Sequence, residues 1–204
     1  MNGLILCNGA PPRRSLLSDA RRHADLFIAA DGGANIAIDY EILPDLVVGD
    51  LDSYRPAGDP GFEVIHEAGQ ESNDLEKALT LAVERGVRRA TVLGATGKRL
   101  DHSLKNLSVL KQFNTRFEEL LFRDNFGDTL LLPRRYETRL DIGTPVSLFP
   151  LSGTVRGIRT QGLKYPLRDE PLINGQRDGS SNEAVEPDIR IEHIEGDLIL
   201  FIAR

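Results

Sequence analysis

Two carboxylates flank one leucine in the stretch Gly49-Asp50-Leu51-Asp52-Ser53, which directly follows the apolar run at 46–48. The apolar run predicts a buried strand, and open parallel sheets bind ligands outside the carboxyl ends of their strands. Side chains alternate along an extended chain, so we expect Asp50 and Asp52 to point to the same side. Carboxylates this close repel each other unless a cation or a proton intervenes, and hard divalent cations prefer oxygen ligands. The alternative is a polar turn, since Gly, Asp and Ser are ordinary turn residues.

Further aspartates stand at comparable places in the chain. Asp31 follows the apolar run at 26–30, Asp74 begins a helical pattern, and Asp101 begins another. Strand-to-helix junctions of a parallel sheet with right-handed crossovers share one edge, so these carboxylates should converge on Asp50 and Asp52. Each aspartate taken alone is explained equally well as a helix cap or a turn former. Together they favour a metal site.

Glycines and cations accompany the acids, at Gly32-Gly33, at Gly49 and in Gly94-Ala95-Thr96-Gly97, which Lys98 and Arg99 follow. Glycine lets backbone N–H groups approach phosphates closely, and helix N-termini favour anions. Arginine is suited to bidentate phosphate contacts. Acids, glycine loops and cations together predict a site for a metal and the phosphates of a nucleotide. Neither a Walker A pattern nor Gly-x-Gly-x-x-Gly after the first apolar run occurs, which argues against a P-loop or a dinucleotide site.

Strand and helix patterns alternate over about the first 120 residues, which is typical of an α/β unit with a largely parallel sheet. The helix pattern after Asn73 is the strongest, because Asn73 can cap it and Glu76 stands at the capping-box position. Strands are predicted at 3–7, 26–30, 46–48, 62–66, 90–93 and 119–122, and helices at 13–24, 34–40, 74–85 and 101–110.

After Phe122 the pattern changes to short β-rich runs separated by Gly or Pro, which is typical of a sandwich or an incomplete barrel. We therefore predict a Rossmann-like α/β domain over 1–124, followed by a small all-β sandwich domain over 125–204. Residues 168–188 are polar and rich in turn formers, and we expect a long loop there, of the kind that is usually functional or disordered.

The bulk composition narrows the class of protein. The 204 residues carry a net charge of −6, which argues against a general nucleic-acid binder. The single cysteine, Cys7, excludes an internal disulfide and lies in an apolar run, so we expect it to be buried. We see no signal-peptide pattern and no apolar stretch long enough to span a membrane. We therefore expect a cytoplasmic protein without a membrane partner.

The motifs in their order resemble those of thiamine pyrophosphokinases. The N-terminal motifs are Asp31-Gly32-Gly33-Ala34-Asn35, Gly49-Asp50-Leu51-Asp52-Ser53, Asn73-Asp74-Leu75-Glu76-Lys77-Ala78-Leu79 and Gly94-Ala95-Thr96-Gly97-Lys98-Arg99-Leu100-Asp101-His102. The C-terminal motifs are Gly162-Leu163-Lys164-Tyr165-Pro166-Leu167 and Ser180-Ser181-Asn182-Glu183.

The resemblance implies an α/β domain joined to a small β-sandwich, a homodimer, and transfer of the pyrophosphoryl group of ATP to the hydroxyl of thiamine with release of AMP. It implies that Asp50, Asp52 and Asp74 hold Mg²⁺ and that Asp101 completes the catalytic acids. The ATP-binding residues implied are Asp31, Gly32, Gly33, Gly94, Thr96, Gly97, Lys98, Arg99 and His102. Those implied for thiamine, in a pocket across the dimer interface, are Gln70, Asn73, Leu163, Tyr165, Ser180, Ser181 and Asn182.

Three residues depart from the pattern of the family. Asn73 stands where threonine commonly precedes the aspartate, and Tyr165 stands where some members carry tryptophan. Lys98 replaces a second glycine before the arginine, which restricts the backbone or adds a phosphate contact. Two alternatives stay open. A related pyrophosphokinase would use another acceptor, such as a hydroxymethylpterin, and a sensor module would bind nucleotide without catalysis. Either Asp74 or Asp101 would orient the acceptor hydroxyl or take its proton.

Overall fold

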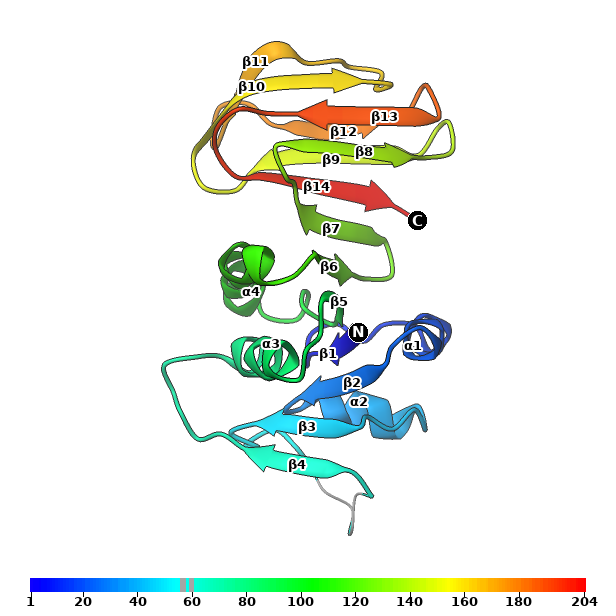
Figure 1. Ribbon diagram of the computed structural model, residues 1–204, viewed down its shortest axis with the longest axis vertical. Coiled ribbons are helices and arrows are strands. Elements are labelled where there is room, and N and C mark those ends of the chain that lie inside the picture. Colours follow the sequence, from blue (N-terminus) through cyan, green and yellow to red (C-terminus); the bar gives the residue numbers. More distant parts are fainter. Residues whose placement is uncertain (56–57, 59–60) are drawn as a thin grey trace. The chain divides into compact units, whose positions relative to one another are not determined.

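The structure of the protein is a computed structural model that describes residues 1–55, 58 and 61–204. The chain divides into two compact units, called unit 1 (Met1–Asn125) and unit 2 (Phe126–Arg204) from here on. Unit 1 alternates strands with helices, whereas unit 2 is built from strands (Figure 1). The protein is thus of mixed α/β architecture.

Unit 1 is organised around a parallel sheet with the strand order β6-β5-β1-β2-β3-β4. Helices cover both of its faces, so the central strands are apolar and buried along almost their whole length. The register places Leu6 beside Ala29 and Leu93, so the neighbouring strands end at one edge. The strands are β1 (Asn2–Leu6), β2 (Leu26–Ala30), β3 (Leu46–Gly49), β4 (Glu63–His66), β5 (Arg89–Leu93) and β6 (Glu119–Arg123).

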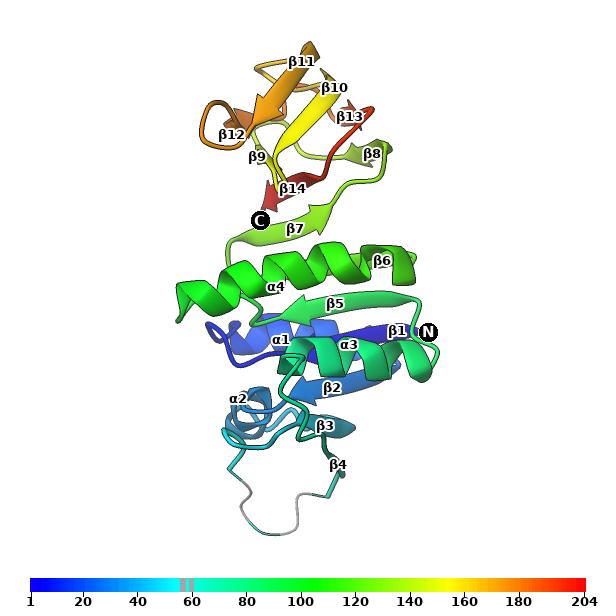
Figure 2. The ribbon, with the colours of Figure 1, turned by 90° about the vertical axis from the view of Figure 1, so that its left-hand side faces the viewer.

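Helices α1 and α2 lie on one face of this sheet, and α3 and α4 lie on the other (Figures 1 and 2). The predicted capping box of α3 is confirmed, because Asn73 accepts a hydrogen bond from the Glu76 backbone and the Glu76 side chain accepts one from the Asn73 backbone. Gly86 follows the helix with a φ of 83°, a left-handed conformation that ends helices. The helices are α1 (Arg14–Arg22), α2 (Gly33–Asp39), α3 (Asp74–Glu84), α4 (Leu100–Phe113) and a 3₁₀ turn, η1 (Asn114–Arg116).

Unit 2 contains antiparallel strands in the orders β12-β9-β14-β7 and β11-β10-β13-β8. Apolar side chains from both groups share one buried core, to which β9 contributes Leu148, β10 contributes Ile158 and β13 contributes Ile191. The strands are β7 (Gly127–Leu131), β8 (Arg135–Arg139), β9 (Pro145–Pro150), β10 (Thr154–Gln161), β11 (Arg168–Ile173), β12 (Gly179–Glu183), β13 (Asp188–Glu192) and β14 (Leu198–Ala203).

The prediction of one long loop over 168–188 is wrong. Strand β11 pairs with β10, and strand β12 pairs with β9, where Gly179 lies beside Leu148 and Asn182 beside Val146. The polar sequence of β12 fits its place, since the strand lies at the edge of its sheet and Asn182 is its one buried residue. Tertiary pairing therefore overrides the low strand propensity of Gly, Ser and Asn.

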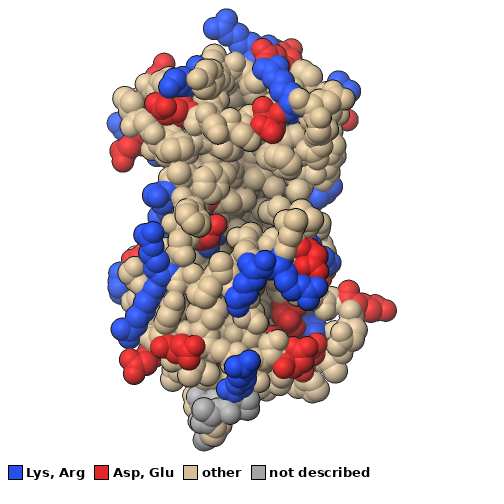
Figure 3. Space-filling model, turned by 180° about the vertical axis from the view of Figure 1, so that it is seen from behind, with Lys and Arg blue, Asp and Glu red and all other residues tan. Residues whose placement is uncertain are grey.

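None of the helices among the described residues is long and apolar enough to cross a bilayer. Acidic and basic side chains are interspersed over the face that Figure 3 shows. This mixed surface agrees with the modest net charge of −6.

Candidate active site

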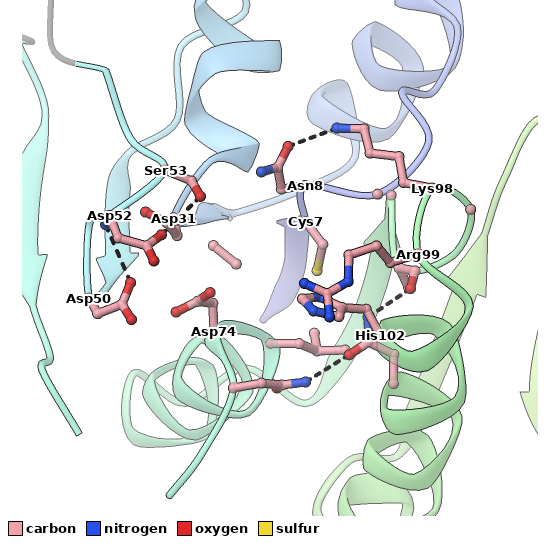
Figure 4. Close-up of a pocket in the computed structure, with 18 residues that line it drawn as sticks. Cys7, Asn8, Asp31, Asp50, Asp52, Ser53, Asp74, Lys98, Arg99 and His102 are labelled. Atoms are coloured by element: carbon pink, nitrogen blue, oxygen red, sulfur yellow. Dashed lines mark hydrogen bonds between the residues drawn. The ribbon is translucent and has the colours of Figure 1, made fainter. Parts of the chain in front are cut away.

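A cavity of about 450 Å³ opens in unit 1 at the carboxyl ends of β1, β2, β3 and β5. Aspartates lie on one side of it and Lys98, Arg99 and His102 on the other, with Cys7 between them (Figure 4). Open parallel sheets bind their ligands at this edge. The lining residues are Cys7, Asn8, Gly9, Ala30, Asp31, Asp50, Asp52, Ser53, Asn73, Asp74, Leu75, Gly94, Ala95, Gly97, Lys98, Arg99, His102 and Asn106.

Three carboxylates form a tight cluster in this cavity. Asp31 follows β2, Asp50 follows β3 and Asp74 begins α3, and one oxygen from each lies within 4.8 Å of the others. Asp31 is buried and adopts a φ of 44°, and its Oδ1 accepts a hydrogen bond from the Tyr54 backbone N–H at 3.1 Å. Three carboxylate oxygens at this spacing suit a hard divalent cation.

Gly49 makes room for the cluster. A Cβ added at Gly49 would lie 2.7 Å from Cβ of Asp31 and 3.1 Å from Oδ1 of Asp74. Any larger residue would therefore displace the carboxylates. The glycine that ends β3 is a requirement of the site and not only a turn former.

The environment separates the acids by their pKa values. Burial raises the pKa of Asp74, and the negative charge of Asp31 raises it further. The buried ammonium of Lys77, which lies 3.5 Å from Oδ1 of Asp74, acts in the opposite direction and lowers that pKa. The pKa of Asp50 is lowered, because its carboxylate accepts hydrogen bonds from the Asp52 backbone N–H and from Gln70. Asp74 therefore takes up a proton before Asp50 does as the pH falls.

Asp52 lines the same cavity but lies outside the tight cluster, where the structure places Asp31 beside Asp50 and Asp74 instead. An extended chain would point Asp50 and Asp52 to the same side, but Leu51 adopts a left-handed φ of 63° that breaks the alternation of side chains. The Asp52 carboxylate accepts a hydrogen bond from the Ser53 hydroxyl at 2.9 Å. Asp31, which the resemblance assigns to ATP binding, is thus the third carboxylate of the cluster in place of Asp52.

Asp101 also differs from the expectation that all five acids converge. Its carboxylate pairs with the guanidinium of Arg99, at 3.1 Å from Nε and 2.5 Å from Nη2. Both side chains are more than half exposed, and Arg99 holds the pKa of Asp101 below its usual range. Asp101 is therefore a partner of Arg99 and lies outside the cluster of acids.

The loop after β5 forms the cationic side of the cavity. It is held to the loop after β1, because the N–H groups of Gly9 and Ala10 donate to the carbonyls of Gly94 and Thr96 at 2.8 and 2.7 Å. Lys98 Nζ donates to Oδ1 of Asn8 at 3.0 Å (Figure 4). The two loops thus act as one wall of the cavity.

Several expected site residues act through the backbone or through neighbours. Gly32, Gly33 and Thr96 are not among the residues that line the cavity. A Cβ at Gly33 would lie 2.0 Å from the carbonyl oxygen of Leu6, so Gly33 permits close packing of α2 against β1. Gln70 donates to Oδ2 of Asp50 at 3.2 Å. Asn73 uses its side chain to cap α3 and to donate to Oδ1 of Asn106 at 2.9 Å.

The sequence did not point to three polar residues of this region: Asn8 and Asn106, which line the cavity, and Lys77, which pairs with Asp74. Lys77 had a usable signal, because it stands three residues after Asp74 on the same helix, where side chains meet. Asn106 donates to the Ala95 carbonyl at 2.7 Å and so ties α4 to the glycine loop. The roles of Asn8 and Asn106 depend on contacts over long sequence separations, which the sequence does not display.

Cys7 is buried as expected, and it lies beside the cluster of acids. Burial and the charge of Asp74 raise the pKa of its thiol to about 12. The thiol therefore stays protonated and unreactive at neutral pH.

In unit 2, the two expected C-terminal motifs meet. Tyr165 N–H donates to Oδ1 of Asn182 at 3.0 Å, and Nδ2 of Asn182 donates to the Tyr165 carbonyl at 2.9 Å. This reciprocal pair fixes the backbone of Tyr165, whose side chain is exposed. Leu163 is buried in the core of unit 2, and its part in a thiamine site stays a prediction. The backbone of Ser181 is in the left-handed conformation, with a φ of 58°, and its N–H donates to the Ser147 hydroxyl. The N–H of Ser180 donates to the carboxylate of Asp178.

Comparison with known protein families accounts for both units. Residues 17–121 match the family model described as thiamin pyrophosphokinase, catalytic domain. Residues 134–196 match the model described as thiamin pyrophosphokinase, vitamin B1 binding domain. The chain belongs to the thiamine pyrophosphokinase family.

Relatives within this family are similar over almost the whole chain. A thiamine pyrophosphokinase 1 of rice is 30% identical over 98% of this chain and 86% of its own length, and a thiamine pyrophosphokinase of Bacillus subtilis is 26% identical over 98% of each. The crystal structure of a thiamin pyrophosphokinase from Geobacillus thermodenitrificans superposes with a TM-score of 0.85 at 26% identity, over 100% of this chain and 98% of that one. The thiamine pyrophosphokinase fold thus extends over both units.

Proposed function

We propose that this chain transfers the pyrophosphoryl group of ATP to the hydroxyl of thiamine, giving thiamine diphosphate and AMP. The observation that carries the proposal is the cavity in which three clustered carboxylates face Lys98 and Arg99. Transfer of a phosphoryl group needs positioning and neutralisation of charge more than covalent chemistry, and the two sides of this cavity suit those tasks. Membership of the family supplies ATP and thiamine as the two substrates.

The donor set supports Mg²⁺ as the cofactor. Asp31, Asp50 and Asp74 offer only hard oxygen ligands within 4.8 Å of one another, and Asp52 stands next to them. We therefore assign Asp31 to the ligand set together with Asp50 and Asp74, and place Asp52 at its margin. A divalent cation held there would neutralise charge on the phosphate oxygens.

The side chains opposite the acids would bind the polyphosphate. Arg99 and Lys98 supply positive charge, and His102 lines the same wall. Of the two residues expected to accept the hydroxyl proton, Asp101 is disfavoured, since its ion pair with Arg99 lowers its pKa and makes it a weaker base. We assign to Asp101 the task of holding Arg99.

For thiamine we propose the exposed ring of Tyr165, with Ser180, Ser181 and Asn182 of the same unit as polar neighbours. In unit 1, Gln70 and Asn73 stay predicted contributors to thiamine binding. An aromatic face favours the fixed positive charge of the thiazolium ring. The ammonium of Lys164 lies 6.0 Å from the centroid of this ring and is paired with Glu183 at 3.2 Å, which limits its repulsion of a second cation. We propose further that unit 1 is a Rossmann-like catalytic domain, that unit 2 is a β-sandwich, and that the chain works as a homodimer.

The test is incubation of the purified chain with ATP, Mg²⁺ and thiamine, followed by chromatographic detection of thiamine diphosphate and AMP. We expect both products in equal amounts, and none when EDTA is added. Hydroxymethylpterin in place of thiamine is the control acceptor and should give no AMP. Hydrolysis of ATP without a thiamine product, or preference for the pterin, would contradict the proposed function. Sedimentation of the same sample tests the homodimer.

A further inference from the structure

Asn106 is a buried polar residue in the middle of α4, and its amide joins two distant segments of unit 1. The residue is 8% exposed. Its Oδ1 accepts a hydrogen bond from Nδ2 of Asn73 at 2.9 Å, and its Nδ2 donates to the carbonyl of Ala95 at 2.7 Å. A buried amide destabilises the fold unless such partners are present, and the loss of one partner leaves the other unpaired. Asn106 therefore fastens both segments to one point on α4.

The bond to Asn73 leads to an acid of the cluster. Asn73 is the N-cap of α3, and Asp74 is the first residue of that helix. Asn73 caps the helix with its Oδ1 and bonds to Asn106 with its Nδ2, so the two ends of one amide have two tasks. A second link joins the same helical turn to α4, since Nζ of Lys105 lies 3.0 Å from Oε2 of Glu76. The beginning of α3 is thus held against α4.

Asp74 needs this support because its place in the cluster is electrostatically unfavourable. One oxygen each of Asp31, Asp50 and Asp74 lies within 4.8 Å of the others, and like charges at that distance repel. Asp31 is held by the sheet, since its N–H donates to the carbonyl of Val48 at 2.9 Å. Asp74 begins a helix instead, and helix ends fray. If the beginning of α3 moves, Asp74 is therefore the acid that leaves the cluster.

The bond to Ala95 leads to the loop over 94–98 after β5, called the glycine loop. Its successive carbonyls at 94–96 each accept a hydrogen bond, from the N–H of Gly9, from Nδ2 of Asn106 and from the N–H of Ala10. The outer two bonds join the glycine loop to the loop after β1, whereas the middle one joins it to α4. Asn106 is thus a connection shared by the glycine loop and the beginning of α3.

We propose that Asn106 is a positioning residue that couples the acid cluster to the glycine loop: its amide holds Asp74 among the acids, through the cap of α3, and holds the loop in place opposite them. This inference rests on the proposed Mg²⁺- and ATP-dependent function. The partners of the Asn106 amide are Asn73 and Ala95, so Asn106 acts on the cation through Asp74. Replacement of residues that orient metal ligands in this way typically weakens metal binding by about 10–100-fold.

Calorimetric titration of Mg²⁺ into the nucleotide-free chain tests the bond that leads to Asp74. Asn106→Leu keeps the size of the side chain and removes both hydrogen bonds, so it should weaken Mg²⁺ binding about tenfold. Asn73→Ser keeps a good helix cap and removes the donor to Asn106, so it should weaken Mg²⁺ by a similar factor. In the double variant the two effects should not add, because both substitutions break the same bond. In turnover assays, Asn106→Leu should need more Mg²⁺ for half-maximal rate and keep the KM for thiamine.

Hydrogen–deuterium exchange tests the bond to the glycine loop. Peptides that cover 94–99 should exchange faster in Asn106→Leu, because the Ala95 carbonyl loses its donor and the loop opens more often. In Asn73→Ser these peptides should exchange as in the wild type, since the bond from Asn106 to Ala95 remains. Leu110→Ala is the matched control for lost stability. Leu110 is fully buried on the same helix and outside the cavity lining, so its replacement should lower Tm and leave Mg²⁺ affinity unchanged.

The proposal is overturned if Asn106→Leu binds Mg²⁺ within about twofold of the wild type, or if its glycine loop exchanges at the rate of the wild type. It is also overturned if Leu110→Ala weakens Mg²⁺ as much as Asn106→Leu does. Should Asn106→Leu fail to fold, Asn73→Ser decides the role of the bond by itself.

Failure of the proposed function looks different. A wild type that binds Mg²⁺ and forms no thiamine diphosphate would contradict the function alone, and the titrations would still decide the role of Asn106. A wild type that binds no Mg²⁺ would overturn both.

Discussion

Replacement of Asp31 by asparagine should make the protein more stable and less active. The substitution removes one negative charge from the cluster with Asp50 and Asp74 and keeps the size of the side chain. It also keeps Oδ1, which accepts the hydrogen bond from the Tyr54 backbone. The repulsion between the acids then falls without the loss of a structural contact, whereas a ligand of the divalent cation is weakened.

The size of the effect follows from the geometry of the cluster. Unit charges within 4.8 Å of each other repel by about 3.5 kcal/mol at an effective dielectric constant of about 20. The side chain of Asp74 is 36% exposed and Lys77 lies 3.5 Å from it, so screening leaves about 1 kcal/mol of net relief. For a chain of 204 residues this corresponds to a rise in Tm of about 2–4 °C.

Thermal unfolding at neutral pH, with EDTA and then with Mg²⁺, measures both effects. In EDTA, Asp31→Asn should unfold above the wild type. With Mg²⁺, the wild type should gain more in Tm, because a cation that binds the folded chain stabilises it more the more tightly it binds. Asp39→Asn is the control, since it removes the same charge from an exposed position on α2 outside the cavity lining. Its free energy of unfolding should change by less than about 0.5 kcal/mol, so its Tm should stay close to that of the wild type.

Two results would refute this reasoning. If Asp31→Asn unfolds below the wild type in EDTA, the contacts of Asp31 outweigh the repulsion, and the cluster is not strained. If Mg²⁺ raises the Tm of both chains equally, Asp31 is not a ligand of the cation.

The same geometry and unit 2 make four further predictions. Gly49→Ala places a Cβ 2.7 Å from Asp31, so it should reduce Mg²⁺-dependent activity at least tenfold and lower stability by about 1–3 kcal/mol, measured by turnover and by chemical unfolding. Mg²⁺ affinity, measured by titration, should weaken as the pH falls through the raised pKa of Asp74, because the cation needs the ionised form. The contribution of Asp74 to the stability of the chain in EDTA should change in the opposite sense, since a carboxyl whose folded pKa is raised contributes stability when protonated and loses it as the pH rises through that pKa. Tyr165→Ala should raise KM for thiamine about tenfold and leave KM for ATP unchanged in steady-state assays. The reason is that the exposed ring contributes to ligand binding and not to the fold. An effect confined to ATP would disprove the placement of the thiamine site.

The convergence of Asp31, Asp50 and Asp74 could be predicted from the sequence, because all three stand where a parallel strand ends or a helix begins. The topology of parallel sheets brings such positions together whatever the side chains do. The position of Asp52 could not be predicted, since it depends on the left-handed φ of Leu51. A residue other than glycine gives no sign of that conformation in the sequence.

The same limit applies to contacts between distant residues. Asn8 and Lys98 are 90 residues apart, and Asn73 and Asn106 are 33 apart, yet each pair shares a hydrogen bond at the cavity. Strand β12 was missed because its polar residues gain order from pairing with β9 and not from their own propensity. Local patterns thus predict the edge of the sheet, whereas long-range pairing decides which side chains meet there.

The buried thiol of Cys7 has a practical consequence for spectroscopy. It is the only cysteine of the chain, and burial raises its pKa to about 12, so maleimide reagents should not label it at neutral pH. A cysteine introduced at an exposed position, such as that of Leu104 on α4 or Ile194 in unit 2, would then be the single site that reacts. Fluorescent or spin labels could be attached without first removing the native cysteine, and motions of the loops around the cavity could be followed in the otherwise native protein.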